Sequence, residues 1–188
     1  MSNHRYNNKL RVIAGQWRGR VIQFKPGPGV RPTPDRVRET VFNWLRPRIE
    51  GAHCLDLFAG SGLLGIEALS QGAKSSTFLD NSKQNIQTLR KNLAHLNSPH
   101  NAIYHTDTLK WLQTPSPQLR YDIVFVDPPF HQNFVSPCCQ LLKDNHWLAQ
   151  QATLYLETEP DYTLELPESW SLLKQKKHGQ TMSYLIET

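Results

Sequence analysis

From about residue 52 the chain alternates short apolar runs with segments of helical spacing, and this alternation limits the available folds more than any other feature. The apolar runs span residues 53–58, 75–80, 101–107, 121–127 and 153–157. The helical segments span residues 62–71, 82–97 and 134–144. Strands that alternate with helices form a mostly parallel sheet covered on both faces. We therefore predict an α/β fold that ends in a hairpin over residues 170–187.

Polar residues and glycine follow these apolar runs where a ligand of such a sheet would bind. Ligands of open α/β sheets sit at the carboxyl ends of the strands, near the point where the strand order reverses. The residues at or just beyond a predicted strand end are Asp56, Gly60, Asp80, Asp107 and Asp127. We expect these residues to lie at one edge of the sheet and to form its ligand site.

The first 48 residues have a different character, because they are strongly basic. They hold eleven Lys or Arg and two Asp or Glu, whereas the remainder holds ten and fourteen. Residues 10–14 and 20–24 predict a hairpin. Thr33 and Pro34 predict a helix start, with Thr33 as the N-cap and Pro34 as the first helical residue. A basic segment of this kind is typical of contact with a polyanion, and a solvated basic tail is the alternative.

A glycine-rich loop, Gly60-Ser61-Gly62-Leu63-Leu64-Gly65, follows the first apolar run and opens a helix. Its spacing fits the dinucleotide fingerprint, so NAD binding is one interpretation, and a turn without a ligand is another. Asp56 favours a third interpretation, because an acid at this position would repel a pyrophosphate but suits the cationic sulfonium and amino groups of S-adenosylmethionine. Asp80 lies 20 residues after Gly60 and can accept both hydroxyls of a ribose.

The most specific motif is Asp127-Pro128-Pro129-Phe130, directly after the fourth apolar run. An exocyclic base amine is a poor nucleophile because its lone pair is delocalised into the ring. The Asp127 carboxylate and the Pro128 carbonyl can accept its two N–H groups and direct the lone pair toward a methyl donor. The prolines fix the backbone, and Phe130 can stack on an extruded base. The alternative is a structural Pro-Pro turn with a solvated aspartate.

Other features restrict the protein class. The three cysteines, without a Cys-x-x-Cys pair, argue against a disulfide framework or zinc site and favour a reducing compartment. We expect no membrane span and no secretory signal, and therefore a cytoplasmic protein. Asp107, with Thr108 beside it, is a candidate for the adenine amine of a cofactor or a solvated strand-end acid. Trp17, Arg18 and Arg20 are candidates for RNA contact, although hairpin packing explains Trp17 equally well.

Several of these segments together resemble the RsmD family. The resemblance rests on Gly15 to Arg20, on Arg31-Pro32-Thr33 through Leu45, on Asp56 to Gly65 and on Phe125 to Phe130. It implies a class I S-adenosylmethionine-dependent methyltransferase fold, Rossmann-like, with a mostly parallel seven-stranded sheet. It also implies a small RNA-facing hairpin and helix extension over residues 1–50, before a methyltransferase domain over residues 51–188.

The resemblance further implies methylation of the 2-amino group of guanine 966 in 16S rRNA, within an assembled or partly assembled small ribosomal subunit. Asp127, Pro128, Pro129 and Phe130 would hold the base. The residues assigned to the cofactor are Asp56, Phe58, Ala59, Gly60, Ser61, Gly62, Asp80, Asn81, Asp107 and Thr108. Arg31, Arg36 and Arg38 would meet phosphate or complete the site. No metal is expected, since the sulfonium is already an activated leaving group, and we expect a monomer.

One position departs from the family pattern, because Asp80 is followed by Asn81 and Ser82 where a glutamate and a later aspartate are common. A shorter acid can still hold the ribose, so we expect weaker or shifted cofactor contacts there at most. Two other functions stay open at this point. A DNA adenine amino-methyltransferase would share the Asp-Pro-Pro-Phe motif but would need a separate module to read sequence. A non-enzymatic RNA-binding assembly factor would keep the basic segment but has no use for that motif.

Overall fold

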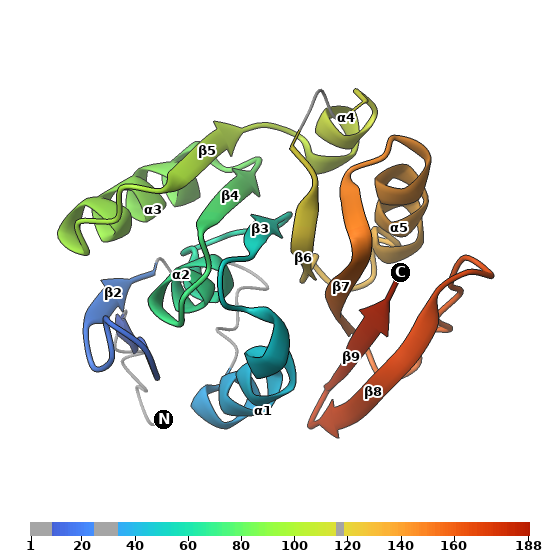
Figure 1. Cartoon of the computed structure of the whole chain (residues 1–188), viewed down its shortest axis with the longest axis horizontal. Helices are drawn as coiled ribbons and strands as arrows, with labels where there is room; N and C mark the ends of the chain where they lie inside the picture. Colours follow the sequence, from blue (N-terminus) through green and yellow to red (C-terminus); the bar gives the residue numbers. More distant parts are fainter. Residues whose placement is uncertain (1–8, 25–33, 116–118) are drawn as a thin grey trace, which may run out of the picture.

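The main sheet is built from seven strands. They are β3 (His53–Asp56), β4 (Ser75–Asp80), β5 (Asn101–His105), β6 (Tyr121–Val126), β7 (Leu148–Thr158), β8 (Ser171–His178) and β9 (Thr181–Glu187). Their order across the sheet is β5-β4-β3-β6-β7-β9-β8 (Figure 1). Strands β3 to β7 are parallel, and β9 and β8 complete the sheet as an antiparallel hairpin. This computed structural model describes residues 9–24, 34–115 and 119–188. The predicted α/β fold with a mostly parallel sheet is confirmed.

The strand order reverses between β3 and β6, at the centre of the sheet. After β3 the chain continues outward through β4 and β5, then returns to β6 and continues in the other direction through β7. Asp56 at the end of β3 lies opposite Phe125 in the parallel register of β6. The glycine-rich loop after β3 and the Asp-Pro-Pro-Phe segment after β6 therefore leave the sheet at the same edge, at the switch point where such sheets bind ligands.

Helices cover both faces of the sheet. The helices are α1 (Asp35–Leu45), α2 (Leu63–Ser70), α3 (Lys83–His95), α4 (Thr108–Leu112) and α5 (Val135–Asp144). On one face, Val41 of α1 packs with Phe125 of β6, and Phe78 of β4 packs with residues of α2 and α3. Successive side chains of a strand point to opposite faces of the sheet, and those on the other face pack against α4 and α5. In the described residues no helix is long and apolar enough to span a membrane.

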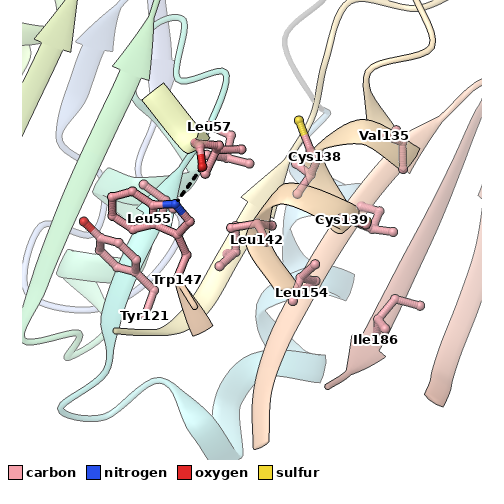
Figure 2. Packing of buried hydrophobic residues seen from close by; sticks show 14 of the residues in the cluster. Leu55, Leu57, Tyr121, Val135, Cys138, Cys139, Leu142, Trp147, Leu154 and Ile186 are labelled. Atoms are coloured by element: carbon pink, nitrogen blue, oxygen red, sulfur yellow. Dashed lines mark hydrogen bonds between the residues drawn. The ribbon is translucent and has the colours of Figure 1, made fainter. Parts of the chain in front are cut away.

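The face beneath α4 and α5 forms the largest apolar cluster (Figure 2). Cys138 and Cys139 of α5 are buried in it and their thiols are free, which matches the core or groove-lining role expected for a cysteine pair on a helix. The indole of Trp147 stacks on Trp111 with 4.1 Å between the ring centroids, and its Nε1–H donates to the Leu112 carbonyl at 3.1 Å. This donation satisfies the one polar group of a buried tryptophan.

The N-terminal hairpin, β1 (Lys9–Arg11) and β2 (Val21–Gln23), is a separate two-stranded sheet that packs on α2 and α3. Its connecting loop binds the end of α2. The Gln16 and Trp17 N–H groups donate to the carbonyl and hydroxyl of Ser70 at 2.7 and 3.0 Å. A Cβ at Gly15 would lie 1.7 Å from the Ser70 carbonyl oxygen, so only glycine allows this close approach.

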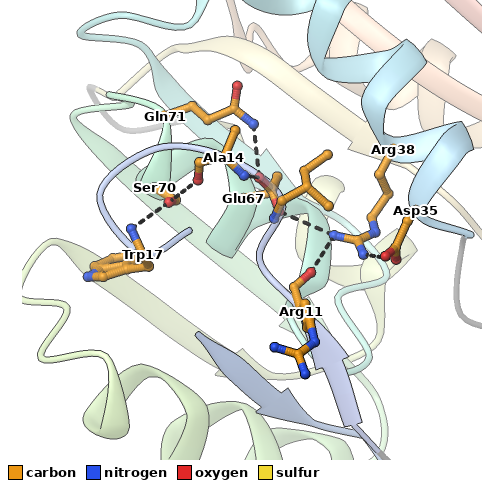
Figure 3. A network of polar contacts seen from close by, with 9 residues as sticks. Arg11, Ala14, Trp17, Asp35, Arg38, Glu67, Ser70 and Gln71 are labelled. Carbon is orange, nitrogen blue, oxygen red and sulfur yellow. Dashed lines mark hydrogen bonds and ion pairs between the residues drawn. The ribbon is translucent and has the colours of Figure 1, made fainter. Parts of the chain in front are cut away.

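A buried ion pair joins the hairpin to two helices (Figure 3). Arg38 of α1 donates to Glu67 of α2 at 3.2 Å and to the Arg11 carbonyl at 2.9 Å, and it also contacts Asp35. Glu67 accepts in addition from the Ile13 and Ala14 N–H groups, each at 3.0 Å. Arg38 and Glu67 are both 0% exposed. The network therefore fixes the hairpin, α1 and α2 relative to one another.

Two residues predicted to contact RNA lie in the interior instead, and these predictions do not fit the structure. Trp17 is 8% exposed and packs in the cluster between the hairpin, α2 and α3. Arg38 is fully buried because its guanidinium completes the Glu67 network, so it is not available to a phosphate. The helix start was also wrong by one residue: Pro34 is the N-cap of α1 and Asp35 its first residue, while Thr33 lies outside the described residues.

Candidate functional site

Asp56 lies at the centre of the predicted ligand edge and is 2% exposed. Its Oδ2 accepts the Gly65 N–H at 3.2 Å, in the first turn of α2. Burial raises the pKa of this carboxyl to about 7. Hydrogen bonds from the Gly65 N–H and, to a smaller extent, the Phe58 N–H oppose the shift, whereas the charge of Asp80 adds to it. Asp56 is therefore only partly ionised near neutral pH, and a cationic ligand beside it would favour the ionised form.

Gly60 is the loop residue with open space beside it. A Cβ added there would meet no atom of the described residues within 4 Å, and its φ is +53°. A ligand can therefore approach the Gly60 backbone, and the left-handed conformation favours glycine. Gly62 differs: its φ is +83° and an added Cβ would lie 2.2 Å from Leu89 Cδ1. Gly62 thus serves the packing of α3 against the loop, and it caps the start of α2.

Asp80 ties the loop to the end of β4. Its carboxylate accepts the N–H groups of Gly60 at 2.8 Å and Ser82 at 2.7 Å, and the Asn85 side chain contacts both oxygens at 3.2 Å. These donors occupy most of its lone pairs. To bind Asp80, the hydroxyls of a ribose would have to replace the two 3.2 Å hydrogen bonds from Asn85. The ribose contact stays a prediction.

The remaining residues assigned to the cofactor surround this loop. The Thr108 hydroxyl is buried and donates to the Leu57 carbonyl at 2.6 Å, so it holds α4 against the loop. Asp107 is exposed and its Oδ1 caps α4 by accepting the Lys110 N–H at 2.9 Å, while no described residue donates to its Oδ2. Asn81 is exposed and its carbonyl contacts His105 at 3.0 Å.

The inner part of the loop is closed by packing. The Phe58 ring lies 5.4 Å from that of Phe134, between centroids, and so joins the loop to the segment that precedes α5. Ala59 is buried and donates its N–H to the Leu79 carbonyl at 2.9 Å. The Ser61 carbonyl accepts from the buried Asn92 side chain at 3.0 Å, and the same amide group pairs with both backbone groups of Gln23 in β2.

The Asp127-Pro128-Pro129-Phe130 segment extends β6 beyond its last paired residue. Pro128 is buried, Pro129 is exposed, and Asp127 and Phe130 are half-buried. Within the described residues, no hydrogen bond reaches the Asp127 side chain. The carboxylate therefore keeps its acceptor sites for an incoming N–H donor, and the exposed part of the Phe130 ring is available for stacking.

Asp127 also lies in an acidic surrounding. Desolvation by the packed side chains, the charge of Glu157 and the charge of Asp56 raise its pKa well above the usual carboxyl value. Glu157, 5% exposed at the end of β7, was missed as a site residue. The rule that identified Asp56 and Asp127, an acid at the end of an apolar strand, also applies to Glu157 and would have found it.

The predicted RNA contacts are only partly at the surface. Arg18, Arg20 and Arg36 are exposed, and Arg20 also donates to the His95 carbonyl at 2.8 Å. Arg31 lies outside the described residues. The exposed arginines lie on the hairpin loop and the first turn of α1.

Comparison with known proteins places the chain in a family. The family model described as conserved hypothetical protein 95 matches residues 10–187. The chain belongs to this family. The ribosomal RNA small subunit methyltransferase D of Haemophilus influenzae is 47% identical over 173 residues, which are 91% of this chain and 90% of that protein. The resemblance to the RsmD family is thereby confirmed.

Solved structures show the same fold. The Escherichia coli protein yhhF, named as a methyltransferase, superposes with a TM-score of 0.86 at 44% identity, over 95% of this chain and 97% of that one. The Thermus thermophilus 16S rRNA N2 G1207 methyltransferase RsmC, solved with AdoMet and guanosine, superposes with a TM-score of 0.68 at 20% identity, over 96% of this chain and 49% of that one. At that identity it shows the fold alone, that of a class I methyltransferase.

Proposed function

We propose that this member of the RsmD family is an S-adenosylmethionine-dependent methyltransferase of small-subunit ribosomal RNA. In finer detail, we propose that it methylates the 2-amino group of guanine 966 in 16S rRNA, within an assembled or partly assembled subunit. The names of its relatives support the coarser statement. We further propose that it acts as a cytoplasmic monomer, with residues 1–50 as an RNA-facing extension and 51–188 as the methyltransferase domain.

The observation that carries the proposal is the position of Asp127 at the switch point of the sheet. The carboxylate lies beyond the end of β6, beside the loop that follows β3, and its acceptor sites are not used by the described residues. An amine placed there donates one N–H to Asp127 and the other to the Pro128 carbonyl. Phe130 then supports the base by stacking. This stacking offsets part of the free energy needed to remove the base from its own stack, which enzymes that modify a base commonly require.

The residues around the loop fit the proposed cofactor. The open space at Gly60 admits a ligand against the backbone, and Asp56 presents a buried carboxylate to a cationic group. The exposed Asp107 offers its Oδ2, which accepts from no described residue, to an adenine amine. When bound, the cofactor supplies a methyl group on a sulfur that is already an activated leaving group. The protein's contribution is to orient the amine and to exclude water.

The RNA side of the proposal rests on Arg18, Arg20 and Arg36, which are exposed on the N-terminal elements. Phosphate contacts of this kind position a substrate and make its affinity depend on salt. Trp17 and Arg38 have no part in this surface, because both are buried.

The test is methyl transfer from labelled S-adenosylmethionine to small subunits that lack the modification, followed by mass spectrometry of the RNA digest. We expect 2-methylguanosine at a single site. Transfer to duplex DNA but not to subunits would instead favour an adenine amino-methyltransferase. Absence of cofactor binding would favour a non-enzymatic assembly factor, and transfer to subunits at another base would refute the guanine assignment alone.

A further inference from the structure

A second carboxylate, Glu157, lies beside Asp127 at the end of the neighbouring strand. Strands β6 and β7 are neighbours in the sheet (Figure 1). Their parallel register pairs Val126 with Leu156, so the next residues along the two strands are Asp127 and Glu157. Adjacent strands are about 4.8 Å apart, and paired residues point to the same face. The two carboxylates therefore extend from neighbouring backbone positions toward the same side of the sheet.

Glu157 is held in place by side chains behind it. The Tyr155 hydroxyl donates to Glu157 Oε1 at 2.5 Å and lies 3.0 Å from the Ser183 Oγ. The antiparallel register places Ser183 of β9 directly opposite Glu157. Tyr155 and Ser183 are both 0% exposed, and the Tyr155 ring packs edge-on against Phe125. A carboxylate fixed by buried partners keeps its charge at a constant position relative to its neighbour.

The charges that act on Asp127 come from both flanking strands. They are Asp56 on β3 and Glu157 on β7, and Tyr155 interacts with Asp127 from the same strand as Glu157. Burial and Glu157 keep the pKa of Tyr155 well above its usual value, so this hydroxyl stays protonated and donates. Burial of the Asp127 carboxyl, and then the charges of Glu157 and Asp56, disfavour its ionised form and make its carboxylate a stronger base.

We propose that Glu157 is a positioning residue whose fixed carboxylate makes Asp127 a better proton acceptor during methyl transfer. This inference rests on the proposed function. In the transfer, the lone pair of the guanine 2-amino nitrogen forms the new N–C bond while the S–CH3 bond breaks with its electron pair left on sulfur. The nitrogen then carries a positive charge and releases one proton to an Asp127 oxygen. A more basic carboxylate accepts this proton more readily.

The test compares the full-length wild-type protein with Glu157→Gln, which removes the charge but keeps the shape and an acceptor for Tyr155. The first readout is the Asp127 carboxyl carbon in NMR titrations, assigned with Asp127→Asn. The second is the acid limb of the kcat profile on small subunits. We expect Glu157→Gln to lower the pKa from the Asp127 titration and the pKa of the acid limb by about one pH unit each. We also expect the fold-decrease in kcat to exceed the fold-change in KM.

Two further variants serve as controls. Glu157→Asp keeps the charge and should keep the acid limb near its wild-type position. Glu187→Gln makes the same chemical change at the other end of β9, where Glu187 pairs with Arg48, and should shift neither readout. Thermal unfolding of each variant checks the fold.

An unchanged Asp127 titration in Glu157→Gln would overturn the inference, as would a shifted titration with an unchanged acid limb. If the wild-type protein fails to methylate any substrate, the proposed function fails. The NMR titration still decides separately whether Glu157 acts on Asp127, because it needs no turnover.

Discussion

Asp56 and Asp127 are both carboxylates at the ends of central strands, but their partners differ. Asp56 is buried and accepts the Gly65 N–H, whereas no described residue donates to the Asp127 side chain. An acid whose position is already fixed by a hydrogen bond is suited to attract a cationic ligand. An acid with unfilled acceptor sites is suited to an incoming donor. This difference at the scale of single residues separates the proposed cofactor contact from the proposed base contact.

The Asp127→Ala variant tests the base contact. We expect methyl transfer to fall by about a hundredfold or more, because the amine loses its main hydrogen-bond acceptor. Cofactor affinity should change little, since the loop after β3 is untouched. Labelled transfer and calorimetric titration of the cofactor measure the two effects. Near-normal turnover would remove Asp127 from the mechanism.

The Asp56→Asn variant tests the cofactor contact through pH. With a pKa of about 7, Asp56 changes from roughly one-tenth ionised at pH 6 to roughly nine-tenths at pH 8. A cationic ligand prefers the ionised form. The ratio of wild-type to Asp56→Asn cofactor affinity should therefore rise by up to about tenfold over this range, and titration of the ligand cancels in the ratio. A ratio that stays constant with pH would show that Asp56 does not contact the cationic part.

At the scale of elements, the glycines of the loop after β3 and of the first turn of α2 divide into two kinds. A Cβ at Gly60 would enter open space, whereas a Cβ at Gly65 would lie 2.3 Å from the Phe78 ring and 2.7 Å from the Ser76 hydroxyl. Gly65 thus allows α2 to pack closely on β4. Gly60 leaves room for a ligand at the start of the same helix. The glycine spacing that resembles a dinucleotide fingerprint therefore combines a packing requirement with a binding requirement.

Alanine substitutions separate these two requirements. Gly65→Ala should destabilise the protein by about 1–2 kcal/mol in urea unfolding, since overpacking outweighs the gain in helix propensity. Gly60→Ala should lower the free energy of unfolding by about 1 kcal/mol, because alanine is disfavoured at the left-handed φ of this position. It should also weaken cofactor binding, because the added methyl group fills the space for the ligand. If Gly60→Ala binds the cofactor as the wild type does, the ligand does not approach the backbone there.

At the scale of the whole molecule, the buried Arg38–Glu67 pair joins the N-terminal hairpin to the methyltransferase core (Figure 3). Burial raises the pKa of Glu67, while hydrogen bonds from Ile13, Gln71 and Ala14 and the charge of Arg38 oppose this shift. The attraction between the two buried charges offsets part of the hydration free energy that each lost on burial. The hairpin is therefore part of the same packed structure as α1 and α2.

The Arg38→Ala variant tests this joint. Removal of one partner leaves Glu67 buried without its charge partner, so we expect a loss of about 3–5 kcal/mol in the free energy of unfolding. Amide hydrogen exchange at Ile13 and Ala14 should accelerate more than in β6. Arg36→Ala, an exposed position on the same helix, is the matched control and should change stability by less than about 0.5 kcal/mol. Equal effects of the two substitutions would show that the buried pair does not hold the hairpin.

Much of the fold and part of the site could be predicted from local patterns. Strands β3 to β7 and helices α2, α3 and α5 follow from apolar periodicity, and β8 and β9 form the predicted hairpin, with ends shifted by up to five residues. Asp56 and Asp127 were found because an acid after an apolar strand marks the ligand edge of a parallel sheet. The positions of these elements and acids could be predicted because each depends on a few neighbouring residues and on a general rule of sheet topology. The roles of Asp56 and Asp127 stay predictions.

The sequence by itself determined that strands alternate with helices and that an Asp-Pro-Pro-Phe segment ends a central strand. Only the tertiary structure decided which charged residues are buried and which strands are neighbours. Arg38 is interior because Glu67, 29 residues later, lies across from it, and Glu157 adjoins Asp127 because β7 pairs with β6. No local pattern contains such information, because the free energy of burying a charge depends on partners that the chain brings together only when it folds.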